Sequence, residues 1–163
     1  MLFRSGGRVG GLCADISRVF PVSGVFSERQ RQIYQIVREC QKEIFSCLRP
    51  GLYLHDLNEK SNTVARRELD KLGLFDQENT DVTRYCWHNV SHHLGHDVHD
   101  VSMKNIPLSA GMTVTVEPGV YVPQWGFGIR LEDDVLITED GCDILSHSFA
   151  RDPDEISTWV KGG

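Results

Sequence analysis

The chain has 163 residues, which is the size of about one domain. Its hydrophobic content of 40% and charged content of 25% are close to soluble globular averages, and its net charge of −6 provides no positive field for nucleic acid or anionic lipid. No apolar run approaches the roughly 18 residues that cross a bilayer. We therefore expect neither a nucleic-acid-binding protein nor a membrane protein.

The five cysteines show no CxxC spacing, which favours reduced thiols over a disulfide framework or a zinc site. The opening MLFRSGGRVGG lacks the apolar core of a signal peptide. We expect an irregular start over residues 1–11, a core over 12–150 and a tail over 151–163, in which PDEISTWV forms a short helix or an ordered tail.

The first half of the chain predicts a strand followed by two helices. Residues 12–20 are typical of a strand, and Ser27 with Gln30 forms a capping box for a helix that Pro50-Gly51 ends. The apolar residues at helical spacing there are Ile33, Val37, Cys40, Ile44 and Leu48. A second helix is predicted from His55-Asp56 to Leu72, before Gly73, with Leu57, Val64, Leu69 and Leu72 facing inward.

From residue 110 onward the pattern changes to period two. In LSAGMTVTVEPGVYV, Glu117 lies on the polar face opposite Val114 and Val116, and in GIRLEDDVLIT, Glu132 lies opposite Leu131. We expect the Pro/Gly-rich stretch 118–128 to turn the chain between these two antiparallel strands, so that Glu117 and Glu132 face one point. CDILS is predicted to form a last strand.

Three carboxylates and one imidazole lie at the edges of apolar, strand-like runs: Asp15, His92, Glu117 and Glu132. Oxygen ligands with one nitrogen suit hard or borderline divalent cations. For Glu117 and Glu132 the alternative is a solvated acid at a strand end, because runs of acids usually mark a solvated edge. For Asp15 the alternative is a structural ion pair with Arg18.

The histidines are unusually dense around this segment. His88, His92 and His99 are spaced four and seven residues apart, which favours a site over isolated core histidines. We assign His93, His96 and His147 to surface or packing positions, and His55 to a helix start.

These segments together resemble the pita-bread metallopeptidase family, in its aminopeptidase P branch. The resemblance runs from residue 14 to 145 and rests on DISRVFPVSG, SHHLGHDVHD, TVEPGVYVP and FGIRLEDDV. It implies an α+β pita-bread fold with a central antiparallel sheet flanked by helices. It also implies a metal-dependent aminopeptidase that releases an N-terminal residue preceding proline, through a metal-bound hydroxide.

The resemblance also implies residue roles. Glu132 would bridge two divalent ions, most commonly Mn²⁺, and Asp15 would bridge them or bind one. His92 and Glu117 would bind the same single ion. Glu117 would carry the proton to the leaving amine. The family residues that contact the substrate or support the carboxylates correspond to His88, His99 and Arg130. We expect the proline pocket to draw on nearby aromatic residues, namely Trp87, Tyr121 and Trp125.

One departure from the family pattern concerns a further aspartate ligand in a segment resembling LxDxG. The chain has no acidic residue before Asp15, and Ser5, near the expected place, cannot balance the charge of a dication. We expect a truncated product without the upstream half of the fold, with one ion or none and with low or no peptidase activity. A sheet edge left exposed would favour association with another chain or a second copy.

Two other interpretations remain beside the peptidase. One is a non-catalytic pita-bread module that binds peptides or protein partners, and the other is a simple metal-binding or structural protein with a histidine-rich loop. By resemblance alone, we expect a mitochondrial or cytoplasmic location.

Overall fold

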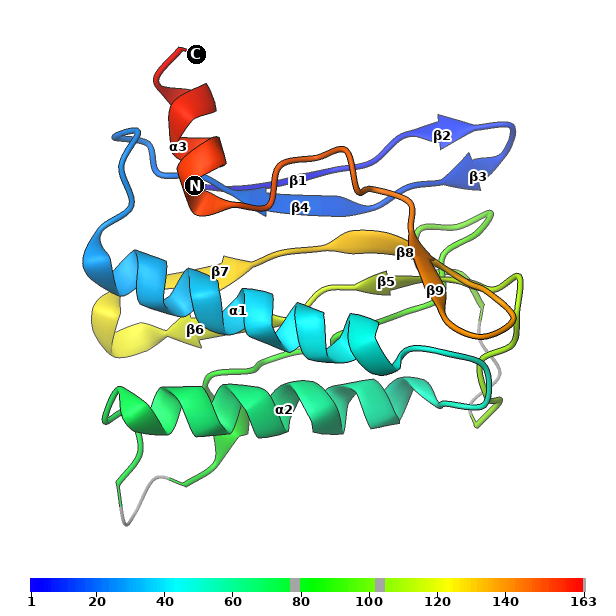
Figure 1. Ribbon diagram of the computed structural model, residues 1–163, viewed down its shortest axis with the longest axis horizontal. Coiled ribbons are helices and arrows are strands. Elements are labelled where there is room, and N and C mark those ends of the chain that lie inside the picture. The colour runs from blue at the N-terminus through cyan, green and yellow to red at the C-terminus, as the bar shows by residue number, and fades with distance from the viewer. Residues whose placement is uncertain (77–79, 102–104, 163) are drawn as a thin grey trace.

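The computed structural model describes residues 1–76, 80–101 and 105–162. Two long helices cover one side of a layer of antiparallel strands (Figure 1). The helices are α1 Glu28–Cys47, α2 Leu54–Lys71 and α3 Pro153–Val160, with short 3₁₀ turns at η1 Val82–Arg84 and η2 Pro123–Trp125. The strands are β1 Leu2–Ser5, β2 Arg8–Val9, β3 Leu12–Cys13, β4 Ile16–Val19, β5 Thr113–Val116, β6 Gly119–Val122, β7 Phe127–Arg130, β8 Asp133–Ile137 and β9 Cys142–Ile144.

The capping box of α1 is confirmed. The Ser27 amide donates to Gln30 Oε1 at 2.9 Å, and the Gln30 amide donates to Ser27 Oγ at 3.3 Å, so both residues satisfy free amides of the first turn. The predicted apolar face of α1 is buried, as is the face of α2 that carries Leu57, Val64 and Leu69. Gly73 follows α2 with a φ of +68°, a conformation that favours glycine at a helix end.

The helices pack on the strands in two apolar clusters. Most of α1 and the C-terminal part of α2 contact β6 and β7, through residues that include Val37, Leu69 and Ile129. The end of α1 and the start of α2 contact β5 and β8, where Ile44 and Leu57 meet the inner face of the sheet. Among the described residues no helix is both long enough and apolar enough to cross a membrane.

The strands form antiparallel ladders that meet at the candidate site. Strand β8 lies between β5 and β9, β6 pairs with β7, β1 pairs with β4, and β2 pairs with β3. A β-bridge between Ser17 and Glu132 helps to join the β1–β4 hairpin to the rest of the layer, as does the hydrogen bond from the Asp15 amide to the Asp134 carboxylate. In the β5–β8 ladder the last pair is Val116 with Asp133, so Glu117 and Glu132 lie just beyond it.

The prediction that residues 118–128 only turn the chain is wrong. This stretch contains β6, which forms a second hairpin with β7 through η2. The antiparallel partner of β5 is β8, which begins at Asp133. The two acids nevertheless meet, because the chain leaves the β5–β8 ladder after Glu117 and returns to it at Glu132.

The prediction of an irregular start over residues 1–11 is also wrong. Residues 2–5 form β1, paired with β4 in a register that sets Arg4 opposite Ser17 and Ser5 opposite Ile16. Within residues 151–163, the segment PDEISTWV forms α3, whose first turn is capped by Asp152. The strand expected over 12–20 is present as β3 and β4, with a break at Ala14-Asp15.

Candidate metal centre

Side chains from four separate segments converge on one point. Asp15 precedes β4, Glu117 follows β5, Glu132 precedes β8, and His92 lies in a loop that hydrogen-bonds to β5 through Thr115. The Nε2 atom of His92 lies 3.3 Å from Glu117 Oε1, 3.8 Å from Asp15 Oδ2 and 4.0 Å from Glu132 Oε1. The structure thus brings together the four residues that the sequence singled out.

The orientation of His92 leaves one nitrogen available for a ligand. Its Nδ1 lies 2.9 Å from the carbonyl oxygen of His93, an acceptor, so Nδ1 carries the proton and donates it. The other ring nitrogen, Nε2, points at three carboxylates. Among the described residues this buried atom has no hydrogen-bond partner, which is the arrangement that a cation between the groups would satisfy.

Glu132 is held in an environment that disfavours its charge. The residue is completely buried, and Oε1 accepts no hydrogen bond from any residue that the structure describes, while Oε2 accepts one from the Ser17 hydroxyl. Burial, together with the charges of the nearby Glu117 and Asp15 carboxylates, raises the pKa of Glu132 to about 7. A divalent cation would remove this penalty by replacing the proton.

These observations test whether a divalent ion fits. Ligand atoms of His92, Glu117 and Glu132 lie within 4.8 Å of one another, two of them on buried groups with no other partner. One nitrogen and two carboxylate oxygens suit a borderline or hard divalent cation. The residues therefore fit one ion.

The other two predicted histidines have different contacts. The ring of His99 contacts that of His92 edge to face, with centroids 4.4 Å apart. The Nε2 atom of His88 lies 2.7 Å from the hydroxyl of Tyr121, and Trp87 stacks on that tyrosine at 4.5 Å. Trp125 takes part elsewhere, since it packs against Phe127 and lies under the guanidinium of Arg29.

Arg130 reaches the centre through Ser17, a residue that the sequence analysis missed. Arg130 Nη2 donates to Ser17 Oγ at 3.2 Å, and that hydroxyl donates to Glu132 Oε2. Ser17 is fully buried between the two. Period two from Asp15 would have placed Ser17 on the same face of the strand, which is the signal that could have found it.

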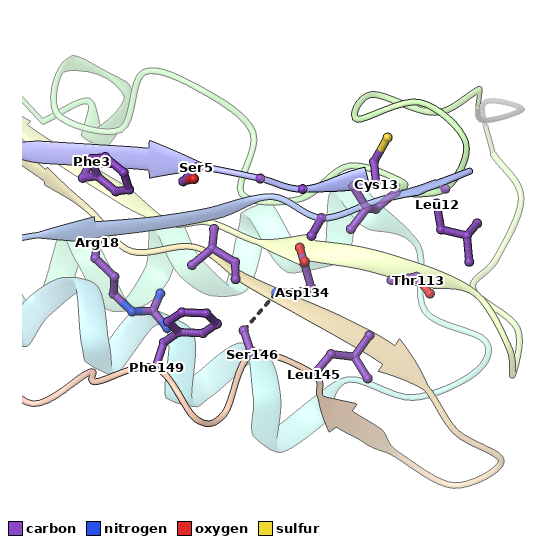
Figure 2. A pocket seen from close by; sticks show the side chains of 16 residues that line it. Phe3, Ser5, Leu12, Cys13, Arg18, Thr113, Asp134, Leu145, Ser146 and Phe149 are labelled. Atoms are coloured by element: carbon purple, nitrogen blue, oxygen red, sulfur yellow. Dashed lines mark hydrogen bonds between the residues drawn. The ribbon is translucent and has the colours of Figure 1, made fainter. Parts of the chain in front are cut away.

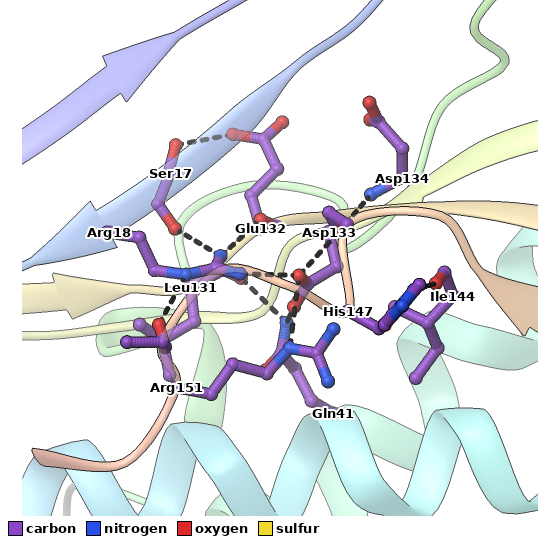
Figure 3. Close-up of polar contacts among 12 residues, drawn as sticks. Ser17, Arg18, Gln41, Leu131, Glu132, Asp133, Asp134, Ile144, His147 and Arg151 are labelled. Carbon is purple, nitrogen blue, oxygen red and sulfur yellow. Dashed lines mark hydrogen bonds and ion pairs between the residues drawn. The ribbon is translucent and has the colours of Figure 1, made fainter. Parts of the chain in front are cut away.

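Asp15 is paired with Arg4, and the sequence analysis missed this residue as well. Arg4 Nε donates to Asp15 Oδ1 at 2.8 Å, and Nη2 forms an ion pair with Oδ2. Arg18, the partner considered for Asp15, instead donates to Asp133 at 2.7 Å (Figure 3). Alternation along β4 explains the difference, because Arg18 points away from the face that carries Asp15 and Ser17.

A cavity of about 780 Å³ lies on the opposite face of the β1–β4 hairpin. Its lining includes Phe3, Ser5, Ile16 and Arg18, which alternate with Arg4 and Ser17 along the two strands (Figure 2). Ser5 therefore faces this groove and not the metal centre. The groove is mainly apolar and does not contain the converging ligands.

Comparisons with known proteins agree with this geometry. The chain is 36% identical to intermediate cleaving peptidase 55 of Saccharomyces cerevisiae over 100% of its own length and 34% of that protein. It is 35% identical to Xaa-Pro aminopeptidase 3 of Homo sapiens, over 88% of this chain and 31% of that protein. The structure matches proline aminopeptidase P II of Yersinia pestis with a TM-score of 0.90 and 34% identity, covering 98% of this chain and 41% of that one.

The family model for metallopeptidase family M24 matches residues 1–139. The chain belongs to this family, and its architecture is the α+β pita-bread arrangement of the aminopeptidase P structures that it resembles. It spans about a third of the length of the curated relatives that it matches.

Proposed function

We propose that this chain carries the metal centre of an aminopeptidase that removes an N-terminal residue preceding proline. The observation that supports this most directly is the Nε2 lone pair of His92, which faces Asp15, Glu117 and Glu132 at 3.3 to 4.0 Å. The names of the relatives, which are Xaa-Pro aminopeptidases and intermediate cleaving peptidases, support the reaction class and the substrate. The ion that we propose is Mn²⁺.

His92, Glu117 and Glu132 would hold the ion. When bound, a divalent cation supplies an acidified water and an electrophile for the peptide carbonyl. Glu117 has the side chain best placed to move a proton, because its carboxylate is slightly exposed, at 10%, whereas that of Glu132 is fully buried. Arg130 and Ser17 fix the orientation of Glu132 Oε2 through their hydrogen bonds.

Other side chains would bind and orient the peptide. His99 stands against His92 and can donate to a substrate carbonyl oxygen, and His88 is held in place by the Tyr121 hydroxyl. Trp87 is 59% exposed and stacks on Tyr121, which gives a flat apolar surface beside His88. We infer that this surface receives the proline ring.

The relative from Arabidopsis thaliana is named as mitochondrial. We propose a mitochondrial location for this chain as well.

Metal titration tests the proposed centre. The chain is expected to bind Mn²⁺ with a change in heat or in electron paramagnetic resonance, and His92→Ala and Glu117→Gln are expected to lose most of that binding. His147→Ala is the matched control, because His147 is exposed and its Nδ1 contacts the carbonyl oxygen of Ile144, away from the centre. Binding that persists in His92→Ala and Glu117→Gln at the wild-type level would reject the centre.

Hydrolysis is tested separately on two short peptides that differ only in having proline or alanine at the second position. Release of the first residue from the proline peptide alone, in the presence of Mn²⁺, is the expected result. Equal cleavage of both peptides would reject the proposed specificity.

One observation favours a second candidate function, a non-catalytic module that binds peptides. The ion pair between Arg4 and Asp15 engages a carboxylate that the resemblance assigns to the metal site. If the chain binds Mn²⁺ and a proline peptide without cleaving it, this second function replaces the first.

A further inference from the structure

The guanidinium of Arg4 lies at the edge of the metal centre. It holds Asp15 through two atoms, Nε to Oδ1 and Nη2 to Oδ2, and the β1–β4 register sets Arg4 directly opposite Ser17, the residue that hydrogen-bonds Glu132. Arginine is always charged in proteins, and its planar fork matches a carboxylate. A permanent cation is therefore built into the site.

We propose that the Arg4 guanidinium takes the place of a second divalent ion, so that the chain holds a single ion between His92, Glu117 and Glu132. This inference rests on the proposed function, since it concerns the same metal centre. The role of Arg4 goes beyond the lack of an acidic ligand. A neutral residue at position 4 would leave the Asp15 carboxylate free to bind a second ion, whereas the arginine side chain occupies that carboxylate.

The charges of the facing groups agree with one ion. Asp15, Glu117 and Glu132 carry three negative charges, and Arg4 supplies one positive charge, which leaves the two that a single divalent cation neutralises. The charges of Arg130, next to Ser17, and of Asp134, next to the Asp15 amide, cancel in this sum. An aspartate in place of Arg4 would leave four negative charges, enough for two such ions. Burial makes this balance important, because uncompensated charge is costly away from water.

The position of the guanidinium also covers one side of Asp15. The Asp15 side chain is 3% exposed and that of Arg4 is 38% exposed, so the arginine is the outer partner. The hydrogen bond to Asp15 raises the pKa of Arg4, and the charges of Asp15, Glu132 and Glu117 raise it further. The guanidinium is thus within electrostatic reach of all three carboxylates, and it would repel a second cation there.

Asp15 is still able to face the single ion. Each carboxylate oxygen has two lone pairs, so accepting from Arg4 does not exhaust Oδ2. That atom lies 3.8 Å from His92 Nε2, on the side of the centre where His92 and His99 offer further nitrogen atoms. Arg4 therefore limits the number of ions without removing Asp15 from the site.

The test counts Mn²⁺ ions in Arg4→Asp and Arg4→Gln variants, by elemental analysis after gel filtration and by calorimetric titration with Mn²⁺ alone. We expect one ion in the wild type and two in Arg4→Asp, where magnetic exchange between paired ions broadens the electron paramagnetic resonance signal. In Arg4→Gln, loss of the positive charge is expected to tighten binding of the first ion by about tenfold or more.

Arg49→Asp and Arg49→Gln are the matched controls, because Arg49 is exposed just after α1 and lies outside the cluster. Both are expected to bind as the wild type does. If Arg4→Asp fails to fold, the affinity of Arg4→Gln decides.

Two ions in the wild type would overturn the inference, and so would wild-type stoichiometry and affinity in both Arg4 variants. The absence of bound Mn²⁺ from wild type and variants alike would instead reject the proposed function. This inference alone fails if His92→Ala loses Mn²⁺ as expected but the wild type binds two ions, or if both Arg4 variants bind one ion with wild-type affinity.

Discussion

Ser17 and Glu132 pair through two reciprocal backbone hydrogen bonds, with the Ser17 amide 3.3 Å from the Glu132 oxygen and the Glu132 amide 3.1 Å from the Ser17 oxygen. The Ser17 hydroxyl donates in addition to the Glu132 carboxylate. This pairing therefore helps to join the N-terminal hairpin to the layer that carries β8, and it orients a carboxylate of the metal centre.

The first prediction concerns that hydroxyl. Ser17→Ala removes the only hydrogen bond that Glu132 Oε2 receives from a described side chain, and it leaves a buried acceptor unsatisfied. We expect a loss of about 1–3 kcal/mol in the free energy of unfolding. Ser46→Ala is the control, because Ser46 is exposed and bonds within its own helix. Urea denaturation of the metal-free proteins measures both, and equal stability of the two variants would contradict the expectation.

The second prediction concerns Asp133, which holds a buried network beneath the centre. Its carboxylate accepts from Arg18, Arg151 and Gln41 (Figure 3). Asp133→Asn leaves the two guanidinium groups without their shared counter-charge, and we expect a loss of about 3–5 kcal/mol in unfolding free energy. The exposed Asp143 on β9 gives the control Asp143→Asn, expected within about 0.5 kcal/mol of wild type. Thermal and urea unfolding of both variants provide the measurement.

The third prediction concerns Gly119, where space is limited. A Cβ atom at this position would lie 2.7 Å from His88 Nε2 and 2.8 Å from the Tyr121 hydroxyl, which is too close for either. Gly119→Ala is expected to separate His88 from Tyr121 and to cost about 1–3 kcal/mol. At Gly141 the nearest atom is Thr138 Oγ1 at 3.8 Å, so Gly141→Ala should be tolerated. Histidine NMR signals would report the broken contact, and an unchanged His88 signal in Gly119→Ala would disprove it.

The fourth prediction concerns stability at high pH. Burial raises the pKa of the Cys40 thiol from about 9 to about 12. The unfolded chain then loses this proton at a lower pH than the folded chain, so the stabilising contribution is complete below pH 9 and is lost as the pH rises toward 12. The slope contributed by one such thiol is at most about 1.4 kcal/mol per pH unit. Unfolding under reducing conditions at pH 8 and pH 10 should show a smaller decline for Cys40→Ala than for wild type.

Local signals predicted much of the fold. The Ser27–Gln30 capping box and the spacing of Ile33, Val37 and Ile44 predict α1, because these signals lie close together in the sequence. Period two placed Glu117 and Glu132 correctly, although the connection between their strands differs from the prediction. The segment GVYV was overlooked as β6 because it lies between a proline and a glycine-containing turn.

Local sequence patterns could not predict the long-range contacts. The pairing of Arg4 with Asp15 depends on the β1–β4 register, which brings together two segments separated by a glycine-rich stretch. The exposed LFRS segment has no clear apolar face that would predict a strand. The network around Asp133 likewise depends on Arg18, Gln41 and Arg151, which are far apart in the chain.

The first twenty residues are joined to the body of the molecule at several points, including the Ser17–Glu132 bridge, the hydrogen bond from the Cys13 amide to the Gly95 oxygen and the ion pair between Arg18 and Asp133. Asp15 lies in this N-terminal segment, whereas His92 and Glu117 belong to the body, so an ion shared among them would add a further link between the two. Backbone amides of β1 and β4 should then exchange with deuterated solvent more slowly when Mn²⁺ is added, while those of α2 should not change.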